Sequence, residues 1–154
     1  MSKVALYNDV FLGVFDFFMK DGDSEKYKAI AEKLKAAKLN AGRLDYVYET
    51  LYRLAKVLEY KTLLGVKTRK LYQSGDKKAL KKLAKSEYTK TIKLLESFYE
   101  AFKAQWYKES KGFGFEVQTI RIGGLMTRLA DCKQMLLDYS AGKVASIPEL
   151  ESGP

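Results

Sequence analysis

The chain has 154 residues, of which 47% are hydrophobic and 31% charged, and a formal net charge of +9. These totals fit one domain with its own core and exclude a disordered chain. The chain contains no histidine and a single cysteine, Cys132, which excludes an internal disulfide, histidine-based nucleophile systems and the usual zinc sites.

The composition favours helices along almost the whole length. The two prolines stand at positions 148 and 154, so nothing before them interrupts a helix. Alternating apolar and polar runs, which are typical of strands, are scarce. We therefore predict an all-α fold, an antiparallel helical bundle of three long helices plus shorter N-terminal helices. The predicted domains are an interdomain linker or short helical segment over 1–22, a helical bundle over 23–151 and a tail over 152–154.

The N-terminal segment is unusually apolar. A turn-like pair, Asn8 and Asp9, precedes a dense run of aromatic and aliphatic residues over 10–19. One short helix can hardly bury every face of such a run, and an apolar patch of that size marks an interface. We expect this segment to pack against another part of a larger protein.

The first regular helix is predicted to begin at Asp23 or Ser24, either of which can cap it. Apolar residues then recur at helical spacing, and Asn40 with Gly42 is expected to end the helix.

The second helix is predicted over 44–72. Leu44, Leu51 and Leu58 are seven residues apart, which predicts one stripe facing the core for several turns. Gly65 interrupts the stripe and is expected to allow a close crossing or a bend.

The end of this helix and the N-cap of the next one are predicted at 74–76. A long amphipathic pattern then runs from Leu80 to Trp106, and we expect Ser86 to mark a kink or a break in it. The last long stripe runs over 117–139, and Gly142 is expected to end its helix.

Between the last two helical patterns lies a loop with two aromatic residues, Phe113 and Phe115. Gly112 and Gly114 release the backbone there from helical dihedral angles. Solvated loops normally carry polar residues, so two interpretations stay open. The loop, with Trp106 before it, is either pinned to the core of its own domain or forms a specific docking surface.

The helix that follows carries four polar residues of interest, Glu116, Gln118, Arg121 and Arg128. An arginine offers a planar fork of donors suited to carboxylates and backbone carbonyls. These two arginines are expected to bind a loop of a neighbouring domain, an acidic residue of their own fold or a ligand. The glycine pair at 123–124 between them favours close helix packing.

A cluster of basic residues raises the alternative of an independent basic module that binds nucleic acid or another acidic polymer. Its members are Lys67, Arg69, Lys70, Lys77, Lys78, Lys81, Lys82 and Lys85. They lie on the outer faces of predicted helices, and no recognition helix or aromatic platform stands beside them. A solvated surface is therefore the preferred interpretation, and we expect no nucleic-acid partner. No stretch resembles a targeting segment or a membrane span, so we expect a cytoplasmic protein without a membrane partner.

Catalytic chemistry finds little support in these residues. Helical carboxylates such as Glu96 and Glu100 have lysines nearby, which favours surface ion pairs. Cys132 lies on an apolar helical face, where a buried, inert thiol is expected. We predict no catalytic residue, no cofactor and no metal site.

Two segments carry a resemblance to a known family, Leu6–Gly13 (LYNDVFLG) and Gly114–Leu125 (GFEVQTIRIGGL). They resemble the C-terminal helical domain of bacterial family 20 glycoside hydrolases, the exo-acting β-N-acetylhexosaminidases. The closing segments Leu136–Tyr139 and Ile147–Leu150 fit as well, so the resemblance runs nearly from end to end. Valine at position 10, where proline would be common, is a small departure.

The resemblance implies a non-catalytic helical domain that follows a (β/α)₈ catalytic barrel, with the barrel of the same parent protein as partner and a homodimer as a further expectation. In such enzymes the barrel supplies an adjacent Asp-Glu pair, which this chain lacks, so the chain alone is expected to be inactive. Candidate residues for the barrel-facing linker are Tyr7, Phe11, Leu12 and Phe15. Candidates for an interdomain contact, the rim of the sugar site or a dimer seam are Trp106, Phe113, Phe115, Glu116, Gln118, Arg121 and Arg128.

Overall fold

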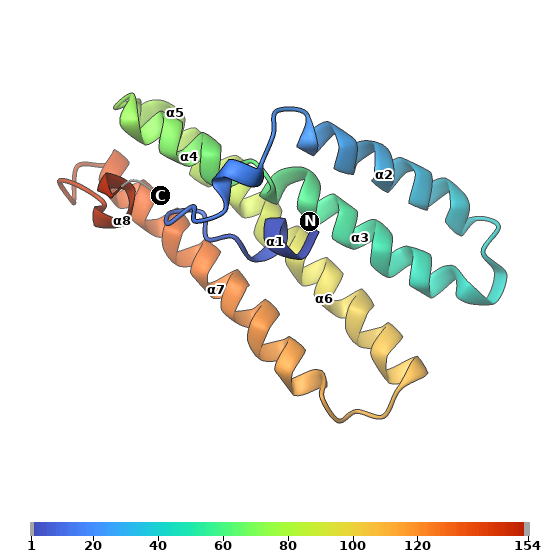
Figure 1. Cartoon of the computed structure of the whole chain (residues 1–154). Helices are drawn as coiled ribbons and strands as arrows, with labels where there is room; N and C mark the ends of the chain where they lie inside the picture. The colour runs from blue at the N-terminus through green and yellow to red at the C-terminus, as the bar shows by residue number, and fades with distance from the viewer. Residues whose placement is uncertain (1, 153–154) are drawn as a thin grey trace.

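The computed structural model describes residues 2–152, and within that range it contains helices and no strand (Figure 1). The predicted all-α fold is therefore confirmed. In chain order the elements are α1 (Ser2–Tyr7), η1 (Asp16–Phe18), α2 (Asp23–Lys38), η2 (Gly42–Leu44), α3 (Asp45–Lys61), α4 (Leu64–Gln73), α5 (Lys77–Leu83), η3 (Ala84–Tyr88), α6 (Thr89–Glu109), α7 (Phe115–Ser140) and α8 (Pro148–Glu151).

The long helices run alternately in opposite directions (Figure 1). Helices α2 and α3 form an antiparallel hairpin, α6 runs back along α3, and α7 returns beside α6. The N-terminal α1 lies across the front of this layer and contacts α3. At the opposite end α8 is held to α4, where the Ile147 N–H donates to the Tyr72 hydroxyl at 3.0 Å.

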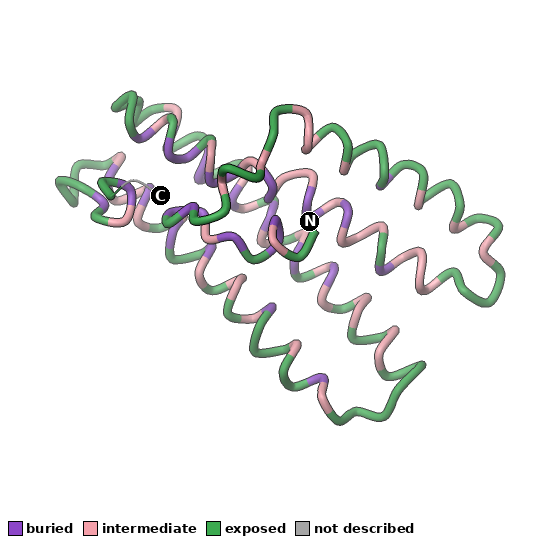
Figure 2. The backbone as a smooth tube through the Cα atoms, in the orientation of Figure 1, coloured by how far each residue is buried: buried purple, intermediate pink, exposed green. Residues whose placement is uncertain are grey.

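The core is concentrated where the N-terminal segment meets α4, α6 and α7. The largest fully enclosed side chains include Phe11, Leu58, Leu64, Tyr88 and Leu129. In Figure 2 the tips of the α2–α3 and α6–α7 hairpins are mainly exposed or half-buried. The domain thus has its own core, and the two hairpin tips extend away from it.

The helix predicted over 44–72 is broken into α3 and α4 by a bend at Thr62 and Leu63. Just after this bend, Gly65 faces the backbone of the N-terminal segment. A Cβ at this position would come within 3.2 Å of the Val10 Cα and carbonyl oxygen. Gly65 therefore provides the expected close crossing, with a non-helical segment as its partner.

The stripe of leucines predicted on this helix is only partly correct. Leu58 is buried, but Leu44 and Leu51 are exposed by 55% and 45%. Helices α2 and α6 cover α3 from two sides, and they bury Thr50 and Val57 in preference to the predicted stripe.

Two predicted helix signals, Ser86 and Gly142, are found at their positions, and the predicted cap at Asp23 or Ser24 is wrong. Helix α2 starts at Asp23, but its N-cap is Gly22 with φ 89°, and the Asp23 carboxylate accepts from the Lys20 N–H at 2.9 Å. Ser86 lies in η3, a π-helical turn that joins α5 to α6 without a break in the helix. Gly142 follows α7 with φ 75°.

The glycine pair at 123–124 does not serve helix packing within this domain. A Cβ built on Gly123 or Gly124 would meet no atom of the described residues within 4 Å. The predicted close packing at this pair is therefore wrong for this domain. No helix within residues 2–152 combines the length and the apolar composition that a membrane crossing requires.

Candidate interdomain surface

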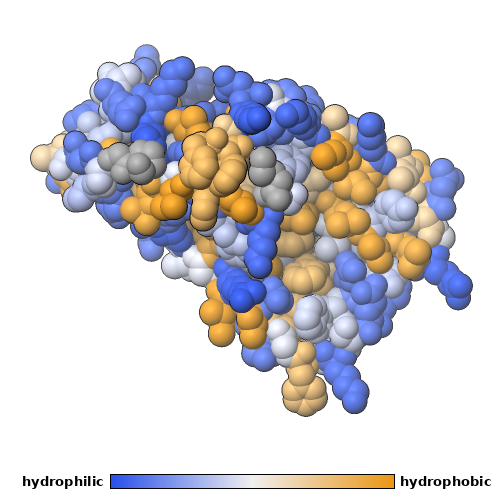
Figure 3. Space-filling view, in the orientation of Figure 1, coloured by the Kyte–Doolittle hydropathy of each residue, from blue (hydrophilic) through white to orange (hydrophobic). Residues whose placement is uncertain are grey.

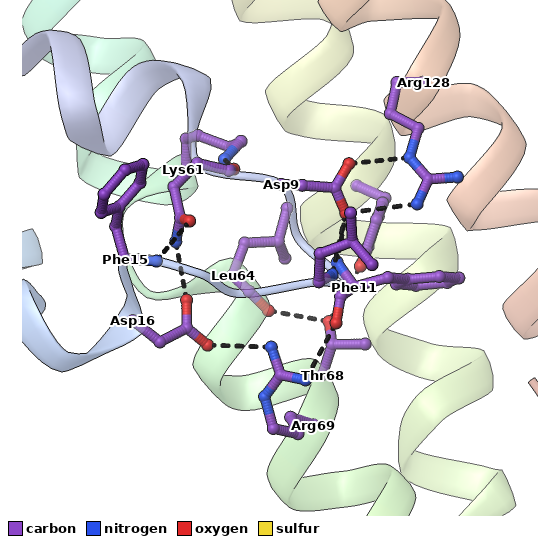
Figure 4. Close-up of polar contacts among 12 residues, drawn as sticks. Asp9, Phe11, Phe15, Asp16, Lys61, Leu64, Thr68, Arg69 and Arg128 are labelled. Carbon is purple, nitrogen blue, oxygen red and sulfur yellow. Dashed lines mark hydrogen bonds and ion pairs between the residues drawn. The ribbon is translucent and has the colours of Figure 1, made fainter. Parts of the chain in front are cut away.

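The loop between α1 and η1 is fixed to the bundle through its backbone (Figure 4). The Lys61 ammonium at the end of α3 donates to the Asn8 carbonyl at 2.6 Å. Arg69 of α4 donates to the Phe11 carbonyl at 2.9 Å and to the Asp16 carboxylate at 3.1 Å. Both donors are buried, so these bonds lie away from competing water.

Asp9 connects the same loop to α7. Its carboxylate accepts from the Phe11 and Leu12 N–H groups at 2.9 and 3.0 Å and from two nitrogens of Arg128 at 2.8 and 3.2 Å. Burial alone would raise the pKa of the Asp9 carboxyl, but the hydrogen bonds from Arg128, Leu12 and Phe11 together lower it to about 2.

Two glycines let the loop lie this close to its supports. Gly13 has φ 62°, and a Cβ there would overlap Arg69 Nη2 at 1.7 Å. Gly65 leaves room for the Val10 backbone on the other side. Within the loop the Asn8 side chain donates to Asp16 at 2.7 Å and accepts from the Phe15 N–H at 3.0 Å. The loop therefore has one well-defined conformation.

Apolar side chains of this rigid loop and of η1 point outward. We call them the linker surface: Leu12, Val14, Phe15, Phe17 and Phe18, which are 46%, 57%, 43%, 73% and 43% exposed. The Phe17 and Phe18 rings pack on each other with centroids 4.2 Å apart. Figure 3 shows hydrophobic atoms gathered on this face over the N-terminal segment. Clustered apolar side chains on a fixed backbone are typical of an interface.

The four residues predicted for the barrel-facing linker divide into two groups. Leu12 and Phe15 belong to the linker surface, and Tyr7 beside it is 37% exposed. Phe11 is completely enclosed by this domain, with the Arg128 guanidinium 5.5 Å from its ring centroid. Phe11 is therefore a core residue here and offers no side-chain surface to another domain.

The two phenylalanines of the glycine-flanked loop differ in burial. Phe115 is 2% exposed and packs among the rings of Tyr99, Phe102, Trp106 and Tyr107. Phe113 is 88% exposed. The Phe115 ring is pinned to its own domain, and for the exposed Phe113 ring the docking surface stays a prediction.

The loop between α6 and α7 is itself well ordered by hydrogen bonds. The Trp106 indole donates to the Lys111 carbonyl at 3.1 Å, and Glu116 accepts from the Gly114 N–H at 2.7 Å. Trp106 and Glu116 thus support the loop that presents Phe113.

The two arginine candidates on α7 differ in their contacts. Arg128 binds acidic residues of its own fold, Asp9 and, at 3.7 Å, Glu149. Arg121 forms no hydrogen bond or ion pair with any residue of 2–152. It lines a hollow of about 450 Å³ together with Gln118 and Tyr7.

Sequence reasoning missed the two buried cations that hold the loop. Arg69 was assigned to the exposed basic cluster, which is wrong because it is 8% exposed and bonded to the loop. Lys61 was not singled out, although it follows the apolar residues of α3 at helical spacing. Burial lowers the pKa of the Lys61 ammonium to about 8, and Asp9 and Asp16 offset part of that effect.

The described residues contain no group of three or more cysteine and acidic side chains placed to hold a metal ion. The lysines of the basic cluster lie on α4, α5 and η3, and Lys67 pairs with Glu87 at 2.9 Å. Cys132 is fully enclosed, and burial raises the pKa of its thiol to about 12.

The fold and the surface together define a helical domain that carries an apolar surface on a fixed N-terminal loop. The chain belongs to the family described as the glycoside hydrolase 20C C-terminal domain, which matches residues 1–154. That description implies a catalytic domain in the same parent protein. No curated protein matches the chain significantly.

Proposed function

We propose that the chain is the non-catalytic helical accessory domain of a β-N-acetylhexosaminidase. In this proposal the linker surface packs against the catalytic barrel of the same polypeptide. The barrel removes terminal N-acetylhexosamine residues by exo-hydrolysis, and the helical domain supports it through interdomain packing.

The observation that carries the proposal is the fixed backbone beneath the linker surface. Lys61, Arg69 and Arg128 each donate to the loop from a different helix. A loop held in this way has little conformational entropy left to lose when its apolar side chains are covered. The linker surface is thus preorganised for a partner.

Dimerisation is the second part of the proposal, and it uses the tip of the α6–α7 hairpin. Tyr107, Phe113, Val117 and Ile120 are exposed there by 56%, 88%, 41% and 73%. This tip extends away from α1 and η1 (Figure 1), so it can meet a second copy while the linker surface is covered by the barrel.

The direct test is an assay of the parent enzyme and of this chain with a nitrophenyl N-acetyl-β-glucosaminide. The parent enzyme is expected to hydrolyse it and the chain alone to show no rate above background. An appreciable rate from the isolated chain would contradict the accessory role.

Packing on the barrel is tested by calorimetric unfolding of the parent enzyme. A docked domain is expected to unfold together with the barrel, and the double substitution Phe17→Ser/Phe18→Ser is expected to split or lower that transition. The matched control is Leu39→Ser, since Leu39 is 86% exposed in the α2–α3 turn, away from the linker surface. Equal effects of the two changes would contradict the proposal.

Dimerisation is tested by the sedimentation of the parent enzyme. The double substitution Phe113→Ser/Ile120→Ser is expected to shift a dimer toward monomer. Unchanged dimer stability would contradict a dimer contact at the α6–α7 tip. Cytoplasmic location also stays a prediction, to be checked by cell fractionation.

A further inference from the structure

Three hollows on the surface share the side chains of Tyr7 and Arg121. One of about 440 Å³ lies toward Lys3 and Phe15. A second of about 450 Å³ extends past Gln118, and a third of about 230 Å³ continues to Gly124 and Arg128. We call them together the Arg121 groove, lined mainly by Lys3, Tyr7, Phe15, Gln118, Arg121 and Gly124. It separates α1 from α7.

The groove carries positive charge that lacks a partner within the described residues. Lys3 and Arg121 form no ion pair with residues 2–152. The carboxylate that also lines the groove, Asp9, is already bound by Arg128 and by two backbone N–H groups. An incoming carboxylate would therefore meet a guanidinium with all its donors available.

The walls of the groove have the composition of an interface centre. Tyr7 and Phe15 supply half-exposed aromatic surface to the same hollow as Arg121. Tyrosine and arginine are enriched among residues that contribute most to binding. Phe15 also belongs to the linker surface, so the groove and the linker surface are continuous.

Gly124 leaves the wall on α7 bare. A glycine inside a helix costs about 1 kcal/mol relative to alanine, and Gly124 has no neighbour within 4 Å of a built Cβ among the described residues. Packing within this domain therefore does not require glycine. An exposed strip of helix backbone beside Arg121 lets another chain approach closely.

We propose that the Arg121 groove receives a carboxylate-bearing, otherwise apolar segment of the catalytic domain, with Arg121 as its ion-pair partner. The proposal rests on the accessory role and names the chemistry of the contact. Charge complementarity selects an acidic side chain for Arg121, and Phe15, which the groove shares with the linker surface, favours the catalytic domain as its source. A largely apolar segment with one acidic side chain satisfies both the walls and Arg121.

The test compares charge reversal in the parent enzyme and in the isolated chain. Arg121→Glu is expected to lower the unfolding temperature of the parent enzyme by several degrees, and Arg121→Met by less. In the isolated chain both substitutions are expected to change it by less than about one degree, since Arg121 has no partner there. Arg43→Glu is the matched control, because Arg43 is exposed in η2, away from the groove.

The identity of the partner is read by zero-length coupling. An Arg121→Lys parent enzyme treated with a carbodiimide is expected to form an amide between position 121 and an Asp or Glu of the catalytic domain, located by mass spectrometry. Coupling at position 121 to a second copy of the helical domain would overturn the proposal.

Three outcomes decide between this proposal and the accessory role. If Phe17→Ser/Phe18→Ser lowers the stability of the parent enzyme but Arg121→Glu does not, the groove proposal fails and the accessory role stands. If neither change affects the parent enzyme, both fail. A loss with Arg121→Glu that equals the loss with Arg43→Glu also overturns the groove proposal.

Discussion

Arg128 of α7 and Asp9 of the N-terminal loop form a two-nitrogen ion pair across 119 residues of sequence. The pair ties the first residues of the chain to its last long helix. It also leaves Arg121, two turns earlier on α7, as the arginine that faces the groove without a carboxylate among the described residues.

Removing the charge of Asp9 should destabilise the domain at neutral pH. Because the pKa is about 2 in the folded chain and near 3.9 in an unfolded one, the pair contributes stability above about pH 4 that is lost as the pH falls through 2. Asp9 is partly exposed to solvent, so we expect Asp9→Asn to cost about 1–2 kcal/mol at pH 7. Urea unfolding from pH 7 to 2 should show the difference from wild type shrinking; a constant difference would contradict the assignment. Asp138→Asn, at an exposed pair with Lys143, is the control and should have little effect.

Replacing Lys61 should change how stability depends on alkaline pH. Its pKa is about 8 when folded and about 10.4 when unfolded, so between these values the unfolded chain binds more protons. The stability of wild type should therefore rise with pH relative to Lys61→Met, by about 3 kcal/mol in all between pH 7 and 11. Comparing the two chains cancels titrations that they share, such as those of Tyr88 and Cys132. If the difference in unfolding free energy between wild type and Lys61→Met does not change with pH, Lys61 is not a buried, charged lysine with a lowered pKa.

The same substitution should have opposite effects at two glycines within helices. Gly65→Ala places a methyl group 3.2 Å from the Val10 backbone, which Lys61 and Arg69 hold in place, so we expect a loss of about 1–3 kcal/mol. Gly124→Ala meets nothing within 4 Å among the described residues and should gain about 0.5–1 kcal/mol from helix propensity. Thermal unfolding of the isolated chain measures both. Stabilisation by Gly65→Ala would show that the loop can move away.

Cys132 should be unreactive until the domain unfolds. The thiol is fully enclosed and its pKa is raised to about 12 by burial, so almost no thiolate exists at pH 8. Reaction with a disulfide reagent should be slow in buffer and rapid in concentrated guanidinium. Fast labelling of the native chain would indicate that α7 opens locally.

The helices were predictable because their signals are local. Apolar spacing and glycine stops placed α2, α6 and α7, and Ser86 and Gly142 marked real features of the backbone. The contact beside the bend between α3 and α4 was harder to predict, because a glycine such as Gly65 indicates only that another segment can approach. The approaching atoms belong to Val10, 55 positions earlier in the chain.

The candidate residues also divide into features with a local signal and features that depend on distant contacts. Aromatic content flagged both the N-terminal segment and the loop at 112–115, but not which rings face outward. Phe11 and Phe115 went into the core while Phe15 and Phe113 stayed exposed. For a segment that is apolar on every face, the direction of each ring depends on which backbone groups are fixed. In the N-terminal segment Lys61 and Arg69 fix them.

The sequence alone determined that this chain forms helices and that it has neither a histidine nor a second cysteine for a disulfide. It also determined that the first twenty residues are too apolar for a solvated linker. These are properties of composition and of short-range spacing. The tertiary structure alone decided which cations are buried and which arginine is left without a partner. Burial and ion pairing depend on groups brought together from distant parts of the chain, and no local sequence pattern specifies which of these groups meet.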